Sequence, residues 1–164
     1  MALHRREADE LVKPRIWRAS PDEARQVATL LAAFRDHLAY DEPDDAALLA
    51  SVERLIVRDD AEYLLAAVGD GPAQGVTQVR YRWGIWWDAE DCWLEDLFVS
   101  GDARGSGLGR ALTEAVIERA RERGCRRVEL DVNTENPAAL ALYRSLGFET
   151  GKTGGQDLLM RRRV

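Results

Sequence analysis

Apolar residues recur at helical spacing in four parts of the chain. The most regular part covers residues 107–124, where one face is apolar and the other is charged. Another begins at the capping sequence S-P-D-E of residues 20–23 and stops before Pro43, and a third follows from about Asp45. The shortest runs over residues 137–146. These patterns predict four helices.

Short apolar runs of extended character lie between the helical segments. They predict strands at residues 16–17, 63–68, 75–83, 93–99 and 127–132, and a terminal strand pair at 148–150 and 156–162. The strands at 75–83 and 93–99 are expected to run antiparallel on either side of a loop. Consecutive strands followed by alternating strands and helices indicate an α/β fold, in which a mixed sheet carries helices on both faces.

The length of 164 residues suits one domain with one core. Residues 1–14 are highly charged and have no apolar period, so they are predicted to be a disordered lead-in. Residues 15–164 are predicted to form the single domain.

Charge and cysteine content narrow the classes of function. The chain has 23 Lys and Arg against 29 Asp and Glu, and its net charge of −6 argues against binding nucleic acid or an anionic membrane. No apolar run approaches the roughly 18 residues that span a bilayer, and no secretory signal is recognisable. Cys92 and Cys125 have neither zinc-binding nor redox spacing. A cytoplasmic protein without a metal is therefore expected.

The sequence R-G-S-G-L-G-R at residues 104–110 opens the most regular helix. Glycines at alternate positions let the backbone pass close to a ligand, and the N–H groups of a helix N-terminus favour an anion such as phosphate. Between residues 102 and 127 there are seven basic and four acidic side chains, so the local charge is opposite to that of the whole chain. The plain alternative is a turn that only connects a strand to a helix.

Two common phosphate-binding motifs do not fit this loop. A nucleotide-triphosphate loop needs Lys and Ser or Thr after its last glycine, but Gly109 is followed by Arg110 and Ala111. A dinucleotide-binding fold needs the spacing G-x-G-x-x-G, whereas the glycines here are spaced G-x-G-x-G.

The segment 94–109 resembles the acetyl-CoA motif of the GNAT superfamily of N-acetyltransferases, through Arg104, Gly107 and Gly109. A second motif of that superfamily, N-x-x-A-x-x-x-Y-x-x-x-G-F, is matched at residues 136–148. The chain departs from the superfamily at Gly101 and Ala103, where proline and an aromatic residue are common.

The resemblance implies a GNAT fold with a mixed, mostly antiparallel sheet, and acetyl-CoA as a substrate. The residues that it implies for acetyl-CoA binding are Leu97, Phe98, Val99, Arg104, Gly105, Ser106, Gly107, Leu108, Gly109, Arg110, Asn136 and Tyr143. By the same resemblance Tyr143 is the acid that protonates the departing thiolate, and the backbone at 97–99 donates to the oxygen that becomes negative. The alternatives are that Tyr143 packs in the helix and that Asn136 caps it.

Glu95 is the candidate base that takes a proton from the amine. A carboxylate inside an otherwise apolar strand is costly to bury, and burial raises its pKa. An ion pair with Arg80 or Arg82 is an alternative role, and Asp96 is a partner or a rival, which points to the other face unless a bulge intervenes. The sequence L-E-D-L-F-V around Glu95 also resembles the spermidine/spermine acetyltransferases, where the first acid lies at the acceptor site.

Acidic residues predominate where an acceptor is expected: nine acids against two Arg at residues 36–62, and five acids at 88–96. A cationic amine is the expected partner, although runs of charge are usually solvated surfaces. Aromatic residues nearby are candidates for stacking on an ammonium group or for contact with a second subunit: Tyr81, Trp83, Trp86, Trp87 and Trp93.

These observations predict an N-acetyltransferase that transfers acetyl from acetyl-CoA directly to a small polyamine or an amino-acid-like amine. A protein lysine, an N-terminal amine and an aminoglycoside stay open as acceptors. The rivals are a non-catalytic acyl-CoA-binding regulatory domain and an interaction protein that forms a homodimer through its tryptophan-rich hairpin.

Overall fold

The computed structural model describes residues 13–150 and residue 162. By contacts within the chain these divide into two compact units, Met1–Asp131 and Val132–Val164. The first unit contains the sheet and three of the helices, and the second contains α4 (Pro137–Ser145). The lead-in expected at 1–14 lies outside the described residues except for Lys13 and Pro14.

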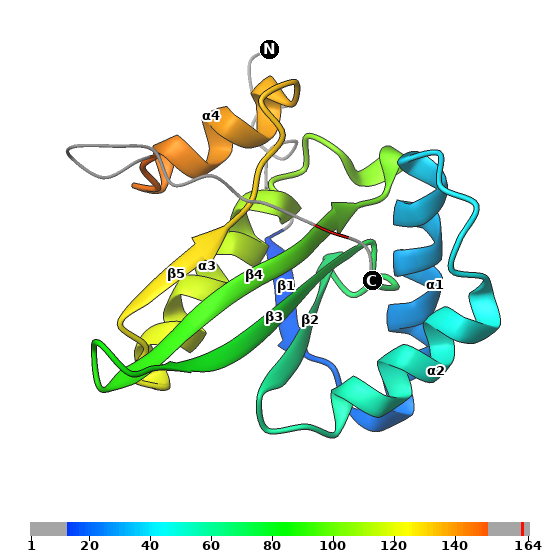
Figure 1. Cartoon of the computed structure of the whole chain (residues 1–164). Helices are drawn as coiled ribbons and strands as arrows, with labels where there is room; N and C mark the ends of the chain where they lie inside the picture. The colour runs from blue at the N-terminus through cyan, green and yellow to red at the C-terminus, as the bar shows by residue number, and fades with distance from the viewer. Residues whose placement is uncertain (1–12, 151–161, 163–164) are drawn as a thin grey trace, which may run out of the picture. The chain divides into compact units, whose positions relative to one another are not determined.

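The first unit is built on a five-stranded sheet in the order β1-β2-β3-β4-β5 (Figure 1). Its strands are β1 (Pro14–Arg18), β2 (Ala61–Val68), β3 (Gly75–Gly84), β4 (Ala89–Val99) and β5 (Arg127–Leu130). All neighbours are antiparallel except β4 and β5, which are parallel. The prediction of a mixed, mostly antiparallel sheet is confirmed.

The helices of the first unit begin where the sequence supplies caps. Before α1 (Ala24–His37), the Glu23 carboxylate accepts a hydrogen bond from the Ser20 N–H at 2.8 Å. Asp44 caps α2 (Asp45–Ile56) by accepting from the Ala47 N–H at 2.8 Å. The third, α3 (Leu108–Glu122), follows the short 3₁₀ helix Gly101–Ala103. The helix predictions are confirmed to within a few residues.

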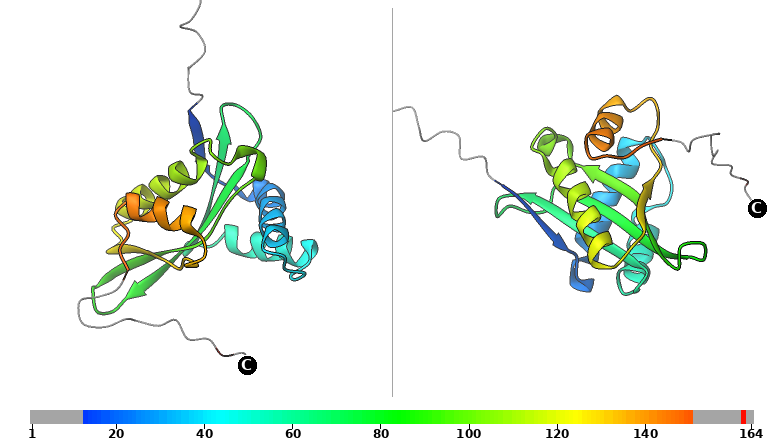
Figure 2. Two further views of the ribbon diagram at one scale, coloured as in Figure 1. Left: turned by 90° about the horizontal axis from the view of Figure 1, so that it is seen from above. Right: turned by 90° about the vertical axis from the view of Figure 1, so that its left-hand side faces the viewer.

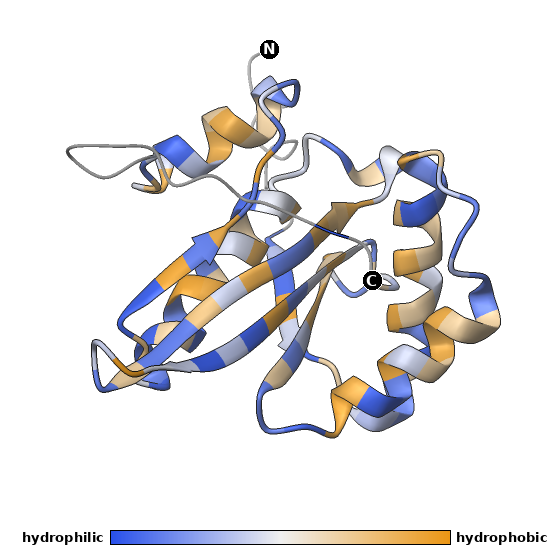
Figure 3. Ribbon diagram, viewed as in Figure 1, coloured by the Kyte–Doolittle hydropathy of each residue, from blue (hydrophilic) through white to orange (hydrophobic). Residues whose placement is uncertain are grey.

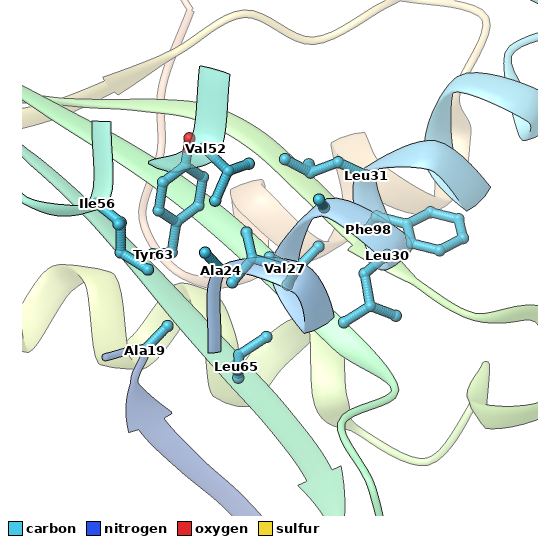
Figure 4. Packing of buried hydrophobic residues seen from close by; sticks show 12 residues of the cluster. Ala19, Ala24, Val27, Leu30, Leu31, Val52, Ile56, Tyr63, Leu65 and Phe98 are labelled. Carbon is cyan, nitrogen blue, oxygen red and sulfur yellow. The ribbon is translucent and has the colours of Figure 1, made fainter. Parts of the chain in front are cut away.

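Each face of the sheet has its own apolar core. On one face α1 and α2 cover Tyr63, Leu65 and Phe98 (Figure 4). On the other face α3 contacts all five strands and buries Leu112 and Val116 against them. The two helical layers lie on opposite sides of the sheet (Figure 2), and the apolar stripes of α1 and α2 are visible in Figure 3. The expectation of helices on both faces is confirmed.

A buried ion pair connects β2 to α3. Glu62 is 4% exposed, and both of its carboxylate oxygens accept from the Arg119 guanidinium, at 2.7 and 3.0 Å. Two parallel charge-assisted hydrogen bonds of this kind fix the relative orientation of the elements that carry them.

The strands differ from their predicted bounds where polar residues hide the pattern. β4 begins at Ala89, well before residue 93, because Glu90 and Asp91 are satisfied by Arg123 and Arg127 instead of facing water. Residues 148–150 are not in a strand, and the partner strand expected at 156–162 lies outside the described residues except for Arg162. Within residues 13–150, no helix has the length and apolar character needed to cross a membrane.

Candidate functional site

The glycine loop joins the end of β4 to the start of α3. Gly105 and Gly107 have φ angles of +82° and +87°, a left-handed conformation that residues with a Cβ rarely adopt. The Ser106 hydroxyl donates to the Ala103 carbonyl at 2.6 Å and holds the turn between the two glycines. The glycines are therefore required by the path of the backbone.

The N-terminus of α3 presents its backbone N–H groups without a side-chain cap. Its N-cap residue is Gly107, which has no side chain to accept from them, and the first turn contains no acidic residue. A Cβ built on Gly105 or Gly107 would meet no atom within 4 Å, so the space beside the loop is open. Open N–H groups at the positive end of a 15-residue helix suit an anion such as a diphosphate.

Two arginines add positive charge to this loop. Arg104 is exposed, and its Nε donates to the Val99 carbonyl at 3.3 Å, which holds the side chain beside the end of β4. Arg110 lies on the first turn of α3, with Glu114 at 3.5 Å. The sequence-predicted residues 104–110 thus present glycine backbone, the helix N-terminus and guanidinium groups, except for Leu108, whose side chain is buried in the core between α3 and the sheet.

The last residues of β4 expose a backbone edge directly before the loop. Pairing between β4 and β5 ends at Leu94 and Leu130, whereas β4 continues to Val99. The Ser100 N–H donates to the Gln74 carbonyl on the β3 side, at 2.8 Å. Since backbone groups alternate in direction along a strand, the N–H groups of Leu97 and Val99 point away from β3.

A β-bulge at Glu95 changes which side chains of β4 face which core. Asp96 lies opposite Gln78, but Leu94 lies opposite Val79, so Glu95 has no partner residue on β3. Before the bulge Leu94 faces the α3 core; after it Leu97 does, and Phe98 faces α1 and α2. The extra residue turns Asp96 toward the α1 and α2 side.

The expectation that Glu95 is buried is wrong. Glu95 is exposed, and its carboxylate accepts a hydrogen bond from the Gln78 amide at 3.2 Å. The two arginines considered as its partners are engaged elsewhere, Arg80 with Asp60 at 3.8 Å and Arg82 with Glu129 at 2.6 Å. A bulge places an extra residue outside the ladder, which is why alternation alone gave the wrong environment.

Asp96 has the environment that the sequence had suggested for Glu95. Its side chain is half-buried, and burial together with the neighbouring charge of Glu95 raises the pKa of Asp96 to about 6. It lies in a cavity of about 250 Å³, which Gln78 and Tyr63 also line. Burial and the nearby carboxylates also raise the pKa of the Tyr63 phenol, so this phenol stays protonated at neutral pH.

Tyr63 and Gln78 are site residues that sequence reasoning missed. Both stand in strands where nearly every neighbour is buried, so Tyr63 is indistinguishable from a core residue by pattern. A polar Gln78 within a buried strand was the one available signal. Figure 4 shows the Tyr63 ring rising from the sheet beside Val52 of α2.

The second unit carries Asn136 and Tyr143. Asn136 caps α4, because its side-chain oxygen accepts from the Ala139 N–H at 3.0 Å. Tyr143 is buried, its ring packs edge-on against Phe148 with centroids 5.6 Å apart, and burial raises the pKa of its phenol. The capping and packing alternatives are thus both present.

The tryptophan-rich hairpin between β3 and β4 is exposed at its tip. Trp83, Ile85 and Trp86 are among its exposed side chains, and Trp87 lies beneath the guanidinium groups of Arg126 and Arg127. Nothing in the described chain covers this tip, so the homodimer expectation stays a prediction.

No group of three or more His, Cys, Asp or Glu side chains placed to hold a metal ion is found among residues 13–150. Cys92 is buried in the core beside α3, and burial raises the pKa of its thiol to about 12.

Comparison with known proteins identifies the fold and the family. The model of the Acetyltransferase (GNAT) family matches residues 24–148. A structure of an aminoglycoside N-acetyltransferase in complex with CoA has a TM-score of 0.76 and 23% sequence identity, and the alignment covers 93% of this chain and 96% of that one. It shows that the fold is shared.

Two curated relatives extend the comparison. A mycothiol acetyltransferase from Thermobifida fusca is 36% identical over 157 residues, covering 88% of this chain and 46% of that protein. An aminoglycoside N(6')-acetyltransferase type 1 from Stenotrophomonas maltophilia is 31% identical over 139 residues, covering 83% and 86%. The chain spans less than half the length of the mycothiol acetyltransferases that it matches. The family match over most of the chain and the aminoglycoside relative together show that this protein belongs to the GNAT family of acetyltransferases.

Proposed function

We propose that this protein is an N-acetyltransferase, which transfers acetyl from acetyl-CoA to a small primary amine by direct attack. One observation carries the proposal. The outward-facing N–H groups of Leu97 and Val99 are followed, after the short 3₁₀ helix Gly101–Ala103, by the glycine loop and the uncapped N-terminus of α3. A strand edge followed by an anion site suits a ligand with an amide-containing arm and a diphosphate.

Acetyl-CoA fits the residues that the sequence assigned to it. The backbone at Leu97, Phe98 and Val99 provides the strand edge, and Arg104, Gly105, Ser106, Gly107, Leu108, Gly109 and Arg110 provide the loop, the N–H groups and the counter-charge. The thioester supplies an activated acetyl group. Asn136 and Tyr143 are assigned to the same ligand by the resemblance of residues 136–148 to the second GNAT motif.

The amine must lose a proton before it attacks, because a lysine-like amine has a pKa near 10.4. We assign the base to Asp96, because its pKa of about 6 makes it ionised at neutral pH and a better acceptor than an ordinary carboxylate. Glu95 is proposed to act through Asp96, since its charge is one cause of the raised pKa. The base thus moves by one residue from the sequence prediction.

The departing thiolate needs a proton, and Tyr143 is the proposed donor. Burial raises the pKa of its phenol, so the group holds its proton at neutral pH. The thiol has a reference pKa near 8.5, below that of the phenol, so Tyr143 is proposed to assist by donating a hydrogen bond to the sulfur and sharing its proton in the transition state, while the C–S bond breaks.

The acceptor has several candidates within this proposal. The L-E-D-L-F-V sequence favours a polyamine, and the relative from Stenotrophomonas maltophilia favours an aminoglycoside. The panel that decides contains spermidine, an aminoglycoside, amino acids, a lysine peptide and simple monoamines, with release of thiol from acetyl-CoA as the readout.

The test of Tyr143 is the variant Tyr143→Phe. It is expected to bind acetyl-CoA as wild type does and to lower kcat by about tenfold or more. Tyr81→Phe is the matched control, because the Tyr81 hydroxyl is buried without a hydrogen-bond partner among the described residues and takes no part in the proposal. If Tyr143→Phe turns over as fast as wild type, Tyr143 is not the acid.

The wild-type protein is also tested for turnover itself. Binding of acetyl-CoA without thiol release for any amine favours the regulatory-domain alternative.

A further inference from the structure

The cavity beside Asp96 is partly open to solvent and is lined mainly by apolar side chains. It has a volume of about 250 Å³ and lies between the sheet and the helices α1 and α2. Its walls include Phe34 of α1 and three residues of α2, Leu48, Val52 and Leu55. The Phe34 ring stacks on the Phe98 ring, with their centroids 5.4 Å apart. The cavity thus combines an apolar wall with the carboxylate that the proposed chemistry requires.

We propose that the acceptor is a primary monoamine carried on a compact apolar body, such as an arylalkylamine, whose body fills this cavity while its nitrogen lies at Asp96. The inference rests on the proposed acetyl transfer, and it selects one class of amine from those left open above.

The volume of the cavity limits the size of the apolar body that it can hold. A cavity of about 150 Å³ holds a benzene ring, and sites for drug-sized ligands start near 300 Å³. A cavity of about 250 Å³ therefore suits a single ring with a chain of two or three carbons. An aminoglycoside, with several linked rings, exceeds this volume, so most of it would lie outside the apolar walls.

The charge around the cavity matches one ammonium group. Its ionisable lining consists of Asp96, Glu42 and Arg35 together with two tyrosines. Arg35 donates to Asp36 and Asp45, at 2.6 and 2.9 Å, so it is held as a cation at the rim. Asp96 and Glu42 are both acidic, and Arg35 is already paired with Asp36 and Asp45, so the lining as a whole favours a cation. A second ammonium group, as in a polyamine, would have to lie against the apolar walls, where it would lose its hydration.

The polar groups that line the cavity are placed to orient the amine. Gln78 lies opposite Asp96 on β3, and its side-chain amide also donates a hydrogen bond to Glu95. Tyr63 adds a protonated phenol. Few polar groups within an apolar wall are the usual arrangement for fixing one orientation of a small ligand.

The experiment measures kcat/KM at pH 8 and saturating acetyl-CoA for 2-phenylethylamine, 3-phenylpropylamine, spermidine and kanamycin. A value about tenfold or more higher for the arylalkylamines than for spermidine and kanamycin supports the inference. Turnover of spermidine or kanamycin at an equal or higher kcat/KM overturns it and leaves the proposed function standing. Absence of thiol release with every amine, including peptides and amino acids, overturns the proposed function and the inference with it.

A pair of variants on α2 tests the location. Ser51 is exposed and lines the cavity, so Ser51→Phe is expected to fill it and to lower kcat/KM for 2-phenylethylamine by about tenfold or more. Glu53→Phe adds the same ring at an exposed position of the same helix outside the cavity and is expected to change nothing. Acetyl-CoA affinity and melting temperature serve as controls for folding. If the two variants change kcat/KM for 2-phenylethylamine equally, or if neither changes it, the apolar body of the acceptor does not lie in this cavity.

Discussion

Asp96 illustrates how a single residue trades stability for reactivity. Its pKa of about 6 in the folded protein lies above the ordinary value of 3.8, so ionising it costs the folded state free energy. The extra stability of the protonated form is complete below about pH 3.8 and is lost as pH rises through about 6. We therefore expect Asp96→Asn to be more stable than wild type above pH 6, by at most about 3 kcal/mol, and equal near pH 4. Urea unfolding between pH 4 and 8 measures this difference.

The same substitution is expected to lower activity and flatten its pH profile. If Asp96 is the base, kcat/KM of the wild type rises with pH up to about 6 and is then constant. In Asp96→Asn, kcat/KM is expected to be about a hundredfold lower and to lack this rise, the acidic limb of the profile. Glu95→Gln is the control at the exposed neighbour: it keeps most activity and moves the limb to lower pH, because the like charge beside Asp96 is removed. An unaltered limb in Asp96→Asn shows that another group is the base.

At the residue scale, the sequence indicated the pair of acids but not which acid faces the cavity. Side chains of β4 alternate between the two faces of the sheet both before and after the bulge. Because Glu95 is an extra residue, Leu94 before the bulge and Leu97 after it face the same core, although they are three positions apart. A bulge depends on how the partner strand pairs, and no local pattern around Glu95 records that pairing. The exposure of Glu95 and the burial of Asp96 therefore needed the structure.

At the scale of elements, the loop before α3 depends on two glycines for its shape. Gly107→Ala places a Cβ on a residue with φ of +87°, which costs about 1–2 kcal/mol, although the space beside it is open. We expect a folded variant with lower stability and weaker acetyl-CoA binding, measured by urea unfolding and calorimetry. Gly101→Ala also meets open space but has no positive φ, and it is expected to leave both quantities unchanged. Equal losses in the two variants contradict a role for the left-handed backbone.

The ion pair between β2 and α3 is predicted to matter most when it is broken on one side. Arg119→Met removes both hydrogen bonds to the buried Glu62 carboxylate and leaves it only the longer contact with Arg18 at 3.9 Å, and is expected to cost about 3 kcal/mol. The double variant Glu62→Met with Arg119→Met is expected to recover much of this loss. Arg121→Met removes an exposed pair with Glu118 on the same helix and is expected to cost under about 0.5 kcal/mol. Similar losses for Arg119→Met and Arg121→Met would show that burial of Glu62 is not the cause.

Elements with local patterns were predicted well, and contacts distant in sequence were not. The caps of α1 and α2 and the apolar face of α3 lie within a few residues of one another, so the helices could be located from the sequence. Glu62 and Arg119 are 57 positions apart, and no local period connects them. The acidic start of β4 was hidden for the same reason, since its arginine partners are the C-cap residue of α3 and a residue of β5.

At the scale of the whole molecule, the net charge of −6 sets the electrostatic attraction between the protein and its substrates. A protonated amine is attracted to the acidic surface, whereas acetyl-CoA depends on the basic glycine loop. Raising ionic strength from about 0.01 to 0.3 M shortens the Debye length from roughly 30 to under 10 Å and screens this attraction.

We therefore expect kcat/KM for 2-phenylethylamine to fall several-fold over this range of ionic strength at saturating acetyl-CoA. An aromatic amine of low pKa, uncharged at the assay pH, is the control and is expected to respond little if it is turned over. The amines differ in charge and little in size, so a difference between their salt dependences isolates the long-range field from the packing in the cavity. Equal salt dependence for the charged and uncharged amines would show that the acidic surface plays no part in recruiting the acceptor.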